Sequence, residues 1–200
     1  MITQLSFDEL TLETKRLVLT PFQSEDVDIA QAVLCDNRVM RFVADIMTPK
    51  AVETHMVDAV KRGAGGRIGI WLARRKDTGA KIGDLVLMPL PIEEDDYDWS
   101  LLVPDTYPDA HIEVGYLLVP DAWGQGFATE ACTRLLRFAF EETSLDEVVA
   151  CADAGNTKSH HVLQKSGLRR NGVRRVYAED DVPWFQLSRQ DWEGEHQTRS

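Results

Sequence analysis

The chain has 200 residues, 44% of them hydrophobic and 28% charged, and its formal net charge is -11 at pH 7. At roughly 150 residues per domain, this length predicts one domain over residues 1–200, with its core over residues 12–192. The acidic net charge disfavours binding to nucleic acid, and no apolar stretch approaches the roughly 20 residues of a membrane helix. The amino terminus lacks the pattern of a secretory signal. We therefore expect a cytoplasmic protein without nucleic-acid or membrane partners.

The first half of the chain predicts a strand, two helices and a hairpin. RLVLTPF, residues 16–22, alternates polar and apolar residues and ends near a proline, as a strand does. Ser24 is the expected cap of the first helix, and Pro49 opens a second helix that ends before Gly63. IGIWLARRK and IGDLVLMPL flank the turn signal DTGAK and predict a hairpin.

Residues 91–110 have no clear period and predict a long inserted loop. The loop contains the acidic run EEDDYD, residues 93–98. A run of this kind is usually a solvated surface segment, although it could also attract a cationic amine.

The second half predicts a strand, a helix, a second strand, a short helix and a closing hairpin. IEVGYLLVP is an apolar strand of the kind buried on both faces, and DEVVACAD is a second strand parallel to it after a helical crossover. The short helix begins at the cap Asn156 and ends at Gly167, and VRRVYAEDD with VPWFQLSRQDW forms the hairpin. The crossover helix runs to about Glu142 and places these residues on one side: Phe127, Ala131, Leu135, Phe138 and Ala139.

Between the apolar strand and the crossover helix lies the turn WGQGFA, with glycine at 124 and 126. The start of a helix carries unpaired N–H groups and partial positive charge, so small residues there allow a phosphate to approach the main chain. A P-loop is excluded because no lysine follows the glycines. A dinucleotide site stays open as an alternative: Thr129 replaces its third glycine, but Asp153 follows the next strand, where a ribose-binding acid would lie.

The three cysteines show neither a CxxC pair nor a histidine at metal-ligand spacing, so we expect no disulfide and no metal site. Cys132 and Cys151 are expected to be small core residues.

Six segments of the chain carry a resemblance to a known family: LETKRLVLTPF, DNRVMRFV, TGAKIGDLVL, IEVGYLLVPDAWGQGFATEA, NTKSHHVLQKSGL and LSRQDW. Together they resemble the GCN5-related N-acetyltransferase (GNAT) superfamily, in particular the branch that acetylates ribosomal protein amino termini. The resemblance spans nearly the whole chain. It implies a single α/β (α+β) domain with a mixed, mostly antiparallel sheet of about seven strands, flanked by helices, with a splayed parallel strand pair at the site of acetyl-CoA. Trp123 departs from the family pattern, which has Gln or Arg at that position, and this puts one cofactor contact in doubt.

The resemblance also implies the site. Glu113 would be the general base and Ser159 would protonate the departing sulfur, and the strand period places His111, Glu113 and Gly115 on one side. His111 is expected to be a polar residue at the strand edge. The main chain at Leu117, Leu118 and Val119 would bind the pantetheine arm, with the Leu118 N–H available to the thioester oxygen. The remaining cofactor contacts would come from the turn and the next helix: Gly124, Gln125, Gly126, Phe127, Ala128, Thr129 and Asn156.

The implied function is acetyl transfer from acetyl-CoA to a primary amine, either a protein amino terminus or a small amine, by a chain that could form a homodimer. An α-amine with a pKa near 7.9 is neutral far more often at pH 7 than a lysine near 10.4, a gap of about 3.4 kcal/mol, which favours α-amines. Two alternatives stay open: a catalytically silent acyl-CoA sensor, and an NAD-dependent oxidoreductase.

Overall fold

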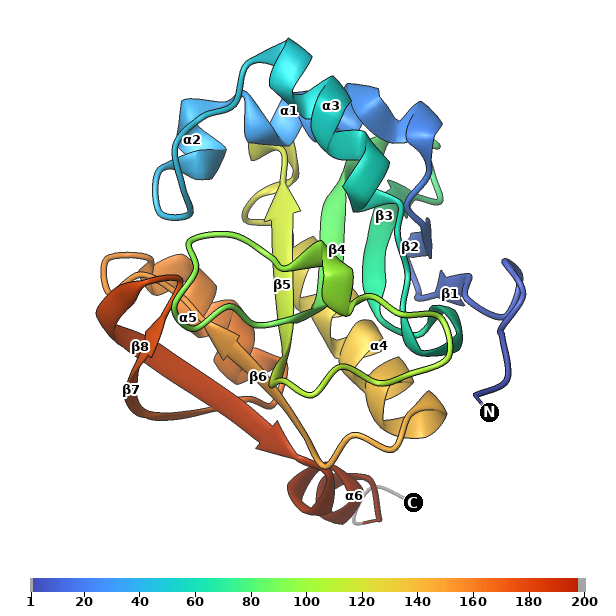
Figure 1. Ribbon diagram of the computed structural model, residues 1–200, viewed down its shortest axis with the longest axis vertical. Coiled ribbons are helices and arrows are strands. Elements are labelled where there is room, and N and C mark those ends of the chain that lie inside the picture. Colours follow the sequence, from blue (N-terminus) through green and yellow to red (C-terminus); the bar gives the residue numbers. More distant parts are fainter. Residues whose placement is uncertain (1, 198–200) are drawn as a thin grey trace.

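The computed structural model describes residues 2–197, which form a sheet in the strand order β1-β2-β3-β4-β5-β6-β8-β7 (Figure 1). Neighbouring strands are antiparallel except β5 and β6, which are parallel, so the mixed, mostly antiparallel sheet is confirmed. It is not the doubly wound parallel sheet that the dinucleotide alternative requires. The strands are β1 Leu12–Glu13, β2 Leu17–Pro21, β3 Gly69–Arg75, β4 Lys81–Pro89, β5 Ile112–Leu118, β6 Glu147–Cys151, β7 Arg169–Val176 and β8 Glu179–Ser188.

Six α-helices within the described residues surround the sheet, and Figure 1 shows α1, α2 and α3 grouped at one end of it. The crossover helix α4 packs on strands β4 and β5, and its Phe138 ring meets Trp71 of β3 edge-on at 5.5 Å between centroids. The five residues predicted for its apolar side are all buried, as is Cys132. The helices are α1 Val27–Leu34, α2 Asn37–Met40, α3 Pro49–Ala59, α4 Phe127–Glu142, α5 Thr157–Lys165 and α6 Arg189–Gln197.

The start of the first helix differs from the prediction. Ser24 is not its cap: a short 3-10 turn, Ser24–Asp26, precedes α1, and the Asp26 carboxylate accepts a hydrogen bond of 3.0 Å from the N–H of Gln23. Asp26 is buried and lies 2.9 Å from Lys81 Nζ of β4. A buried acid paired across the fold therefore takes the capping position, which the sequence near Ser24 does not reveal.

The carboxyl end of the chain also differs from the prediction. LSRQDW does not continue the closing strand, because β8 ends at Ser188 and α6 begins at Arg189. The Ser188 hydroxyl accepts a hydrogen bond of 3.1 Å from the N–H of Asp191, as a helix cap does. The closing hairpin itself, formed by β7 and β8, is confirmed.

The β3–β4 hairpin brings β4 very close to β5 at one glycine. Gly83 pairs with Leu118 and has a φ of +145°, and a Cβ at this position would overlap the carbonyl oxygen of Leu117. Glycine is therefore required for the main chains of β4 and β5 to pair at the end of β5.

We expect Gly83→Ala to lower the free energy of unfolding by about 3 kcal/mol or more, because strained backbone adds to overlap with a carbonyl that cannot move away. Chemical denaturation measures this loss. Gly79→Ala is the matched control, since Gly79 also has a positive φ but its added Cβ would meet nothing within 4 Å; the expected loss is about 1 kcal/mol. Equal losses in the two variants would contradict the close approach at Gly83.

Candidate active site

The centre of the site is the point where β5 and β6 stop pairing. The two strands are in register at Glu113 and Val149, whereas β5 stays paired with β4 as far as Leu118. Beyond Glu113, no further β5–β6 register pair occurs in the part of the chain that the structure describes. This separation explains why Gly115, Tyr116 and Leu117 are half-buried rather than buried on both faces as predicted.

Hydrogen bonding on the other edge of β5 decides which main-chain groups face the gap. The N–H of Val119 donates to the carbonyl of Ile82 over 2.9 Å, so odd-numbered residues of β5 direct their main-chain groups toward β4. The N–H and C=O of Tyr116 and Leu118 therefore point into the gap. Of the three residues predicted to bind the pantetheine arm, Leu118 faces the gap, while Leu117 and Val119 are committed to β4.

The departure from the family pattern at Trp123 has a structural role. The Trp123 indole N–H donates to the carbonyl of Leu118 over 2.7 Å, which connects the glycine turn to the end of β5. This bond occupies the Leu118 carbonyl and leaves its N–H directed into the gap. The Trp123 ring is 39% exposed, and the ammonium of Lys158 lies 5.7 Å from its centroid.

The glycine turn presents unpaired amides at the start of α4. Gly124 and Gly126 have φ values of 70° and 79°, and Gly126 caps the helix without any side-chain hydrogen bond. The first helical bond runs from the N–H of Glu130 to the carbonyl of Gly126, so the N–H groups of residues 127–129 have no partner within the helix. A Cβ on Gly124 would meet nothing within 4 Å, so the turn has open space beside it. These features fit an anion.

Two arginines outside the predicted site lie beside this turn, and each is paired with a carboxylate at 2.6 Å, Arg16 with Glu130 of α4 and Arg75 with Asp77. Arg16 donates to the carbonyl of Gln125 over 2.9 Å, and its guanidinium lies 4.3 Å from the centroid of the Phe127 ring. The guanidinium of Arg75 lies 5.2 Å from the same ring. Gln125 is exposed, and its side-chain amide donates to the carbonyl of Asp121 over 2.7 Å within the turn.

The predicted acid, Ser159, lies beside a tyrosine to which the sequence assigned no role. Its hydroxyl is 2.9 Å from the Tyr116 hydroxyl, and its N–H donates to the side-chain oxygen of Asn156 over 3.2 Å. The predicted cap at Asn156 is therefore confirmed. Burial raises the pKa of Tyr116, so its phenol stays protonated at neutral pH. By strand alternation, Tyr116 and Ser159 lie on the face of β5 opposite to Glu113.

The predicted base, Glu113, is 4% exposed and lies in a hydrogen-bonded cluster. The Tyr97 hydroxyl donates to its Oε1 over 2.6 Å, and the Tyr177 hydroxyl donates to the same oxygen. The Cys151 thiol lies 3.9 Å from Oε2, so this half-buried cysteine contacts the site as well as the core. Burial raises the pKa of Glu113, and the hydrogen bonds from Tyr177, Tyr97 and Cys151 oppose that rise. His111 instead points to Glu147, with its Nδ1 at 3.1 Å from that carboxylate.

A second buried carboxylate, Asp84, lies on the same face of the sheet as Glu113. It pairs across the strands with Leu117, which is four residues beyond Glu113 on β5. Asp84 is 9% exposed, and within the described residues its carboxylate has no hydrogen-bond or ion-pair partner. Burial raises its pKa from 3.8 to about 7.

Residues 2–197 lack the features of a metal site and of a membrane-spanning helix. Within residues 2–197, no group of three or more His, Cys, Asp and Glu side chains is arranged to hold a metal ion. No helix there is long and apolar enough to cross a membrane. Asp153, the acid of the dinucleotide alternative, accepts a hydrogen bond of 2.6 Å from the N–H of Gly155 in its own loop.

The sequence and the fold are similar to those of known proteins. A family model described as "Acetyltransferase (GNAT) domain" matches residues 16–169. The chain is 27% identical to the FsC-acetyl coenzyme A-N(2)-transacetylase of Aspergillus fumigatus over 196 residues, which cover 91% of this chain and 77% of the relative. It is 36% identical to the putative ribosomal N-acetyltransferase YdaF of Bacillus subtilis over 88 residues, which cover 42% of this chain and 48% of the relative.

The solved structures include a protein with the same fold and a bound cofactor. RimL, a ribosomal L7/L12 alpha-N-protein acetyltransferase in complex with coenzyme A, superposes with a TM-score of 0.67 at 13% sequence identity, covering 89% of this chain and 97% of RimL. At this identity the likeness establishes a shared fold.

We expect Asp84→Asn to remove a pH-dependent loss of stability. The folded protein binds the Asp84 proton more tightly than the unfolded chain, so ionisation destabilises the fold progressively as pH rises from about 4 to about 7. The free energy of unfolding of the variant, relative to the unsubstituted protein, should therefore rise by up to about 4 kcal/mol between pH 4 and pH 8. Denaturant titrations across this range measure it.

Asp28→Asn is the control of opposite sign. Burial raises the pKa of Asp28, but the hydrogen bonds to its carboxylate, of which the one from Lys81 is the largest, lower the pKa by more than burial raises it. The net shift of the pKa is therefore downward. This variant should lose stability relative to the unsubstituted protein as pH rises through the acid range. A flat response in Asp84→Asn would show that the Asp84 carboxyl is not desolvated in the folded protein.

Proposed function

The chain belongs to the GNAT acetyltransferase family and is an acetyl-CoA-dependent N-acetyltransferase, and we propose that it acetylates a primary α-amine with Glu113 as the general base. The observation that carries this proposal is the placement of Glu113. Its carboxylate is buried on β5 at the last residue paired with β6, directly before the gap into which the Leu118 N–H points. A base and a donor for a developing oxyanion therefore lie on one strand beside one opening.

Residues of this chain fit the two polar parts of coenzyme A. The amides of residues 127–129, with the open space at Gly124, suit a diphosphate, and the side chains of Arg16 and Arg75 lie beside the Phe127 ring at the same helix start. The main-chain N–H and C=O of Tyr116 suit the amides of the pantetheine arm, because they are what an added strand would bind, while the Leu118 N–H stays available to the thioester oxygen. Asn156 lies next to Ser159 at the start of α5 and would contact the same arm.

Proton movements follow from the positions of the side chains. When bound, acetyl-CoA supplies an acyl carbon activated as a thioester. Glu113 accepts a proton from the amine, directly or through water, while the N–H of Leu118 donates a hydrogen bond to the oxygen on which negative charge develops. Ser159, hydrogen-bonded to the protonated Tyr116 phenol, donates a proton to the sulfur from the opposite face of β5.

The acceptor proposed here is an α-amine, on a protein amino terminus or on a small molecule. At neutral pH a larger fraction of a free α-amine than of a lysine side chain is in the neutral, nucleophilic form. The free energies of deprotonation differ by about 3.4 kcal/mol, so an α-amine requires less of the base. The similar proteins named above include an N(2)-transacetylase and an alpha-N-protein acetyltransferase of a ribosomal protein. The exposed acids of residues 93–98 lie in the same loop as Tyr97, and their charge favours a cationic acceptor.

The test is release of free thiol from acetyl-CoA by the purified protein with a panel of amino-terminal peptides, amino-acid-like amines, polyamines and aminoglycosides. The proposal predicts turnover with α-amines and less with lysine side chains of matched peptides. Tight binding of acetyl-CoA by calorimetry without transfer to any amine would instead identify a silent acyl-CoA sensor.

Glu113→Gln should lower kcat/KM for the acceptor by about 10²–10³-fold, because the amide cannot accept the proton, and it should abolish the acid limb of the pH profile. The affinity for acetyl-CoA should change less than about twofold. Glu141→Gln is the matched control: Glu141 lies on the exposed side of α4, paired with Arg137, and its loss should leave turnover unchanged. Unchanged turnover in Glu113→Gln would remove Glu113 from the mechanism.

A further inference from the structure

The 91–110 loop is fastened to the tip of the β7–β8 hairpin. Tyr177 and Ala178 form that tip with φ values of 52° and 57°, the left-handed conformation of a two-residue hairpin turn. Their N–H groups donate to the carbonyls of Pro91 and Ile92, each over 3.1 Å. Arg175 adds an ion pair of 3.0 Å to Glu93. The hairpin tip and the start of the loop therefore lie over β5 as one unit.

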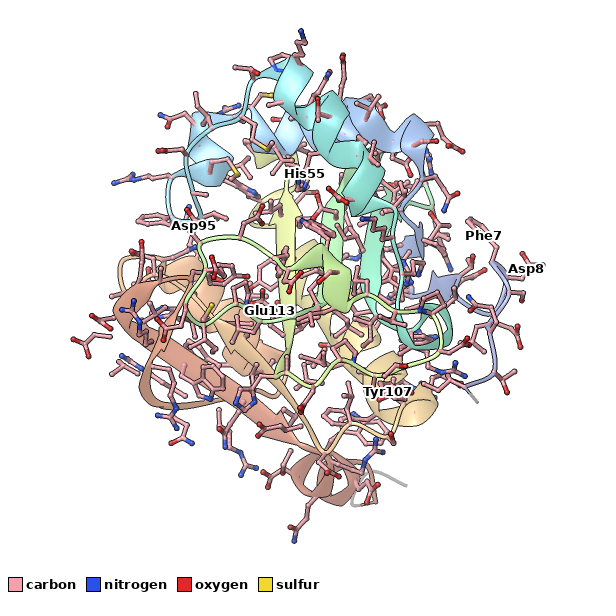
Figure 2. The ribbon with its side chains drawn as sticks, in the orientation of Figure 1. Phe7, Asp8, His55, Asp95, Tyr107 and Glu113 are labelled. Carbon is pink, nitrogen blue, oxygen red and sulfur yellow. The ribbon has the colours of Figure 1, made fainter. Side chains whose placement is uncertain are left out.

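Each part of this unit contributes one phenol to Glu113. Tyr97 comes from the loop and Tyr177 from the hairpin tip, and their rings meet edge-on at 6.1 Å between centroids. Trp99 supports Tyr97 from the other side at 5.6 Å, and His55 of α3 in turn meets Trp99 at 5.2 Å. In Figure 2 the 91–110 loop passes across Glu113.

The two phenols act on one carboxylate oxygen. Both donate to Oε1, whereas Oε2 lies 3.9 Å from the Cys151 thiol, which is a weak donor. Cys151 belongs to β6, so Oε2 is the oxygen on the side of the gap between β5 and β6. Oε1 is thereby saturated, and Oε2 retains a lone pair for a proton.

We infer, on the basis of the proposed function, that Tyr97 and Tyr177 are positioning residues that hold Glu113 ionised and direct its Oε2 toward the acceptor. A carboxylate with 4% exposure loses most of its hydration, and two phenol donors replace part of it. Their own protons stay in place, because burial raises the pKa of both phenols well above the usual value. The loop and the hairpin tip therefore help to set the protonation state of the base.

The surroundings of Glu113 contain few other titratable groups. The groups that face it are Tyr97 from the loop, Tyr177 from the hairpin tip and Cys151 from β6. Its neighbour on β4 is Met88, which carries no charge. No cationic side chain among residues 2–197 forms an ion pair with it. A change in either phenol should therefore be measurable in the titration of Glu113.

The test compares the pH dependence of kcat/KM in Tyr97→Phe and Tyr177→Phe. Each loses one donor to the ionised carboxylate and keeps its ring, so the acid limb should move upward by about one pH unit, and further in the double variant. KM for acetyl-CoA should stay unchanged. Tyr107→Phe is the matched control: Tyr107 belongs to the same loop and packs against the core, without a hydrogen bond to Glu113, and its acid limb should superpose on that of the unsubstituted protein.

Acid limbs that stay in place in both Tyr97→Phe and Tyr177→Phe would overturn the inference, even if turnover falls, because a purely structural role lowers the rate without moving the limb. A carboxyl-carbon NMR titration of Glu113 in the same variants gives the protonation state independently of turnover. If Glu113→Gln retains full activity, the base assignment has failed instead. If Glu113→Gln is inactive while the tyrosine variants keep the original titration, the role of the tyrosines alone has failed.

Discussion

The site depends on one constraint: β5 loses its parallel partner after Glu113 while it stays paired with β4 to its end. Alternation along the strand then determines the direction of every group. Leu118 turns its N–H into the gap, Val119 remains bound to Ile82, and Glu113 lies on the face opposite to Tyr116. Gly83 is needed for β4 to follow β5 this far, and Trp123 connects the same strand end to the glycine turn.

Charge is distributed so that the two sides of the gap suit different ligands. The chain is acidic overall, at -11, yet the start of α4 presents unpaired amides beside Arg16 and Arg75, which are paired with Glu130 and Asp77. An anion at this turn therefore meets the partial positive charge of the helix start, which the net charge of the chain does not suggest. Glu113 and Asp84 are each buried on the face of the sheet opposite to Tyr116, and burial raises the pKa of both carboxyls. That face is suited to an amine.

Local patterns predicted the parts of the fold that neighbouring residues determine. The glycine turn, the apolar side of α4 and the cap at Asn156 each depend on residues within a few positions, and each is as predicted. Long-range contacts decided the rest. Tyr97 and Tyr177 are 16 and 64 positions from Glu113, and Arg16 is 109 positions from Gln125, so no local spacing could select them. Ser24 failed as a cap because Asp26 pairs with a lysine on β4.

The most direct test of the gap is residue-resolved hydrogen exchange of the amides of Leu118 and Val119, with and without acetyl-CoA. Val119 donates to Ile82 in the free protein and should be protected in both states. Leu118 should exchange rapidly in the free protein and become protected when acetyl-CoA is added, together with the amides of residues 127–129. Protection of Leu118 in the free protein, or no change at Leu118 when the cofactor binds, would contradict the account.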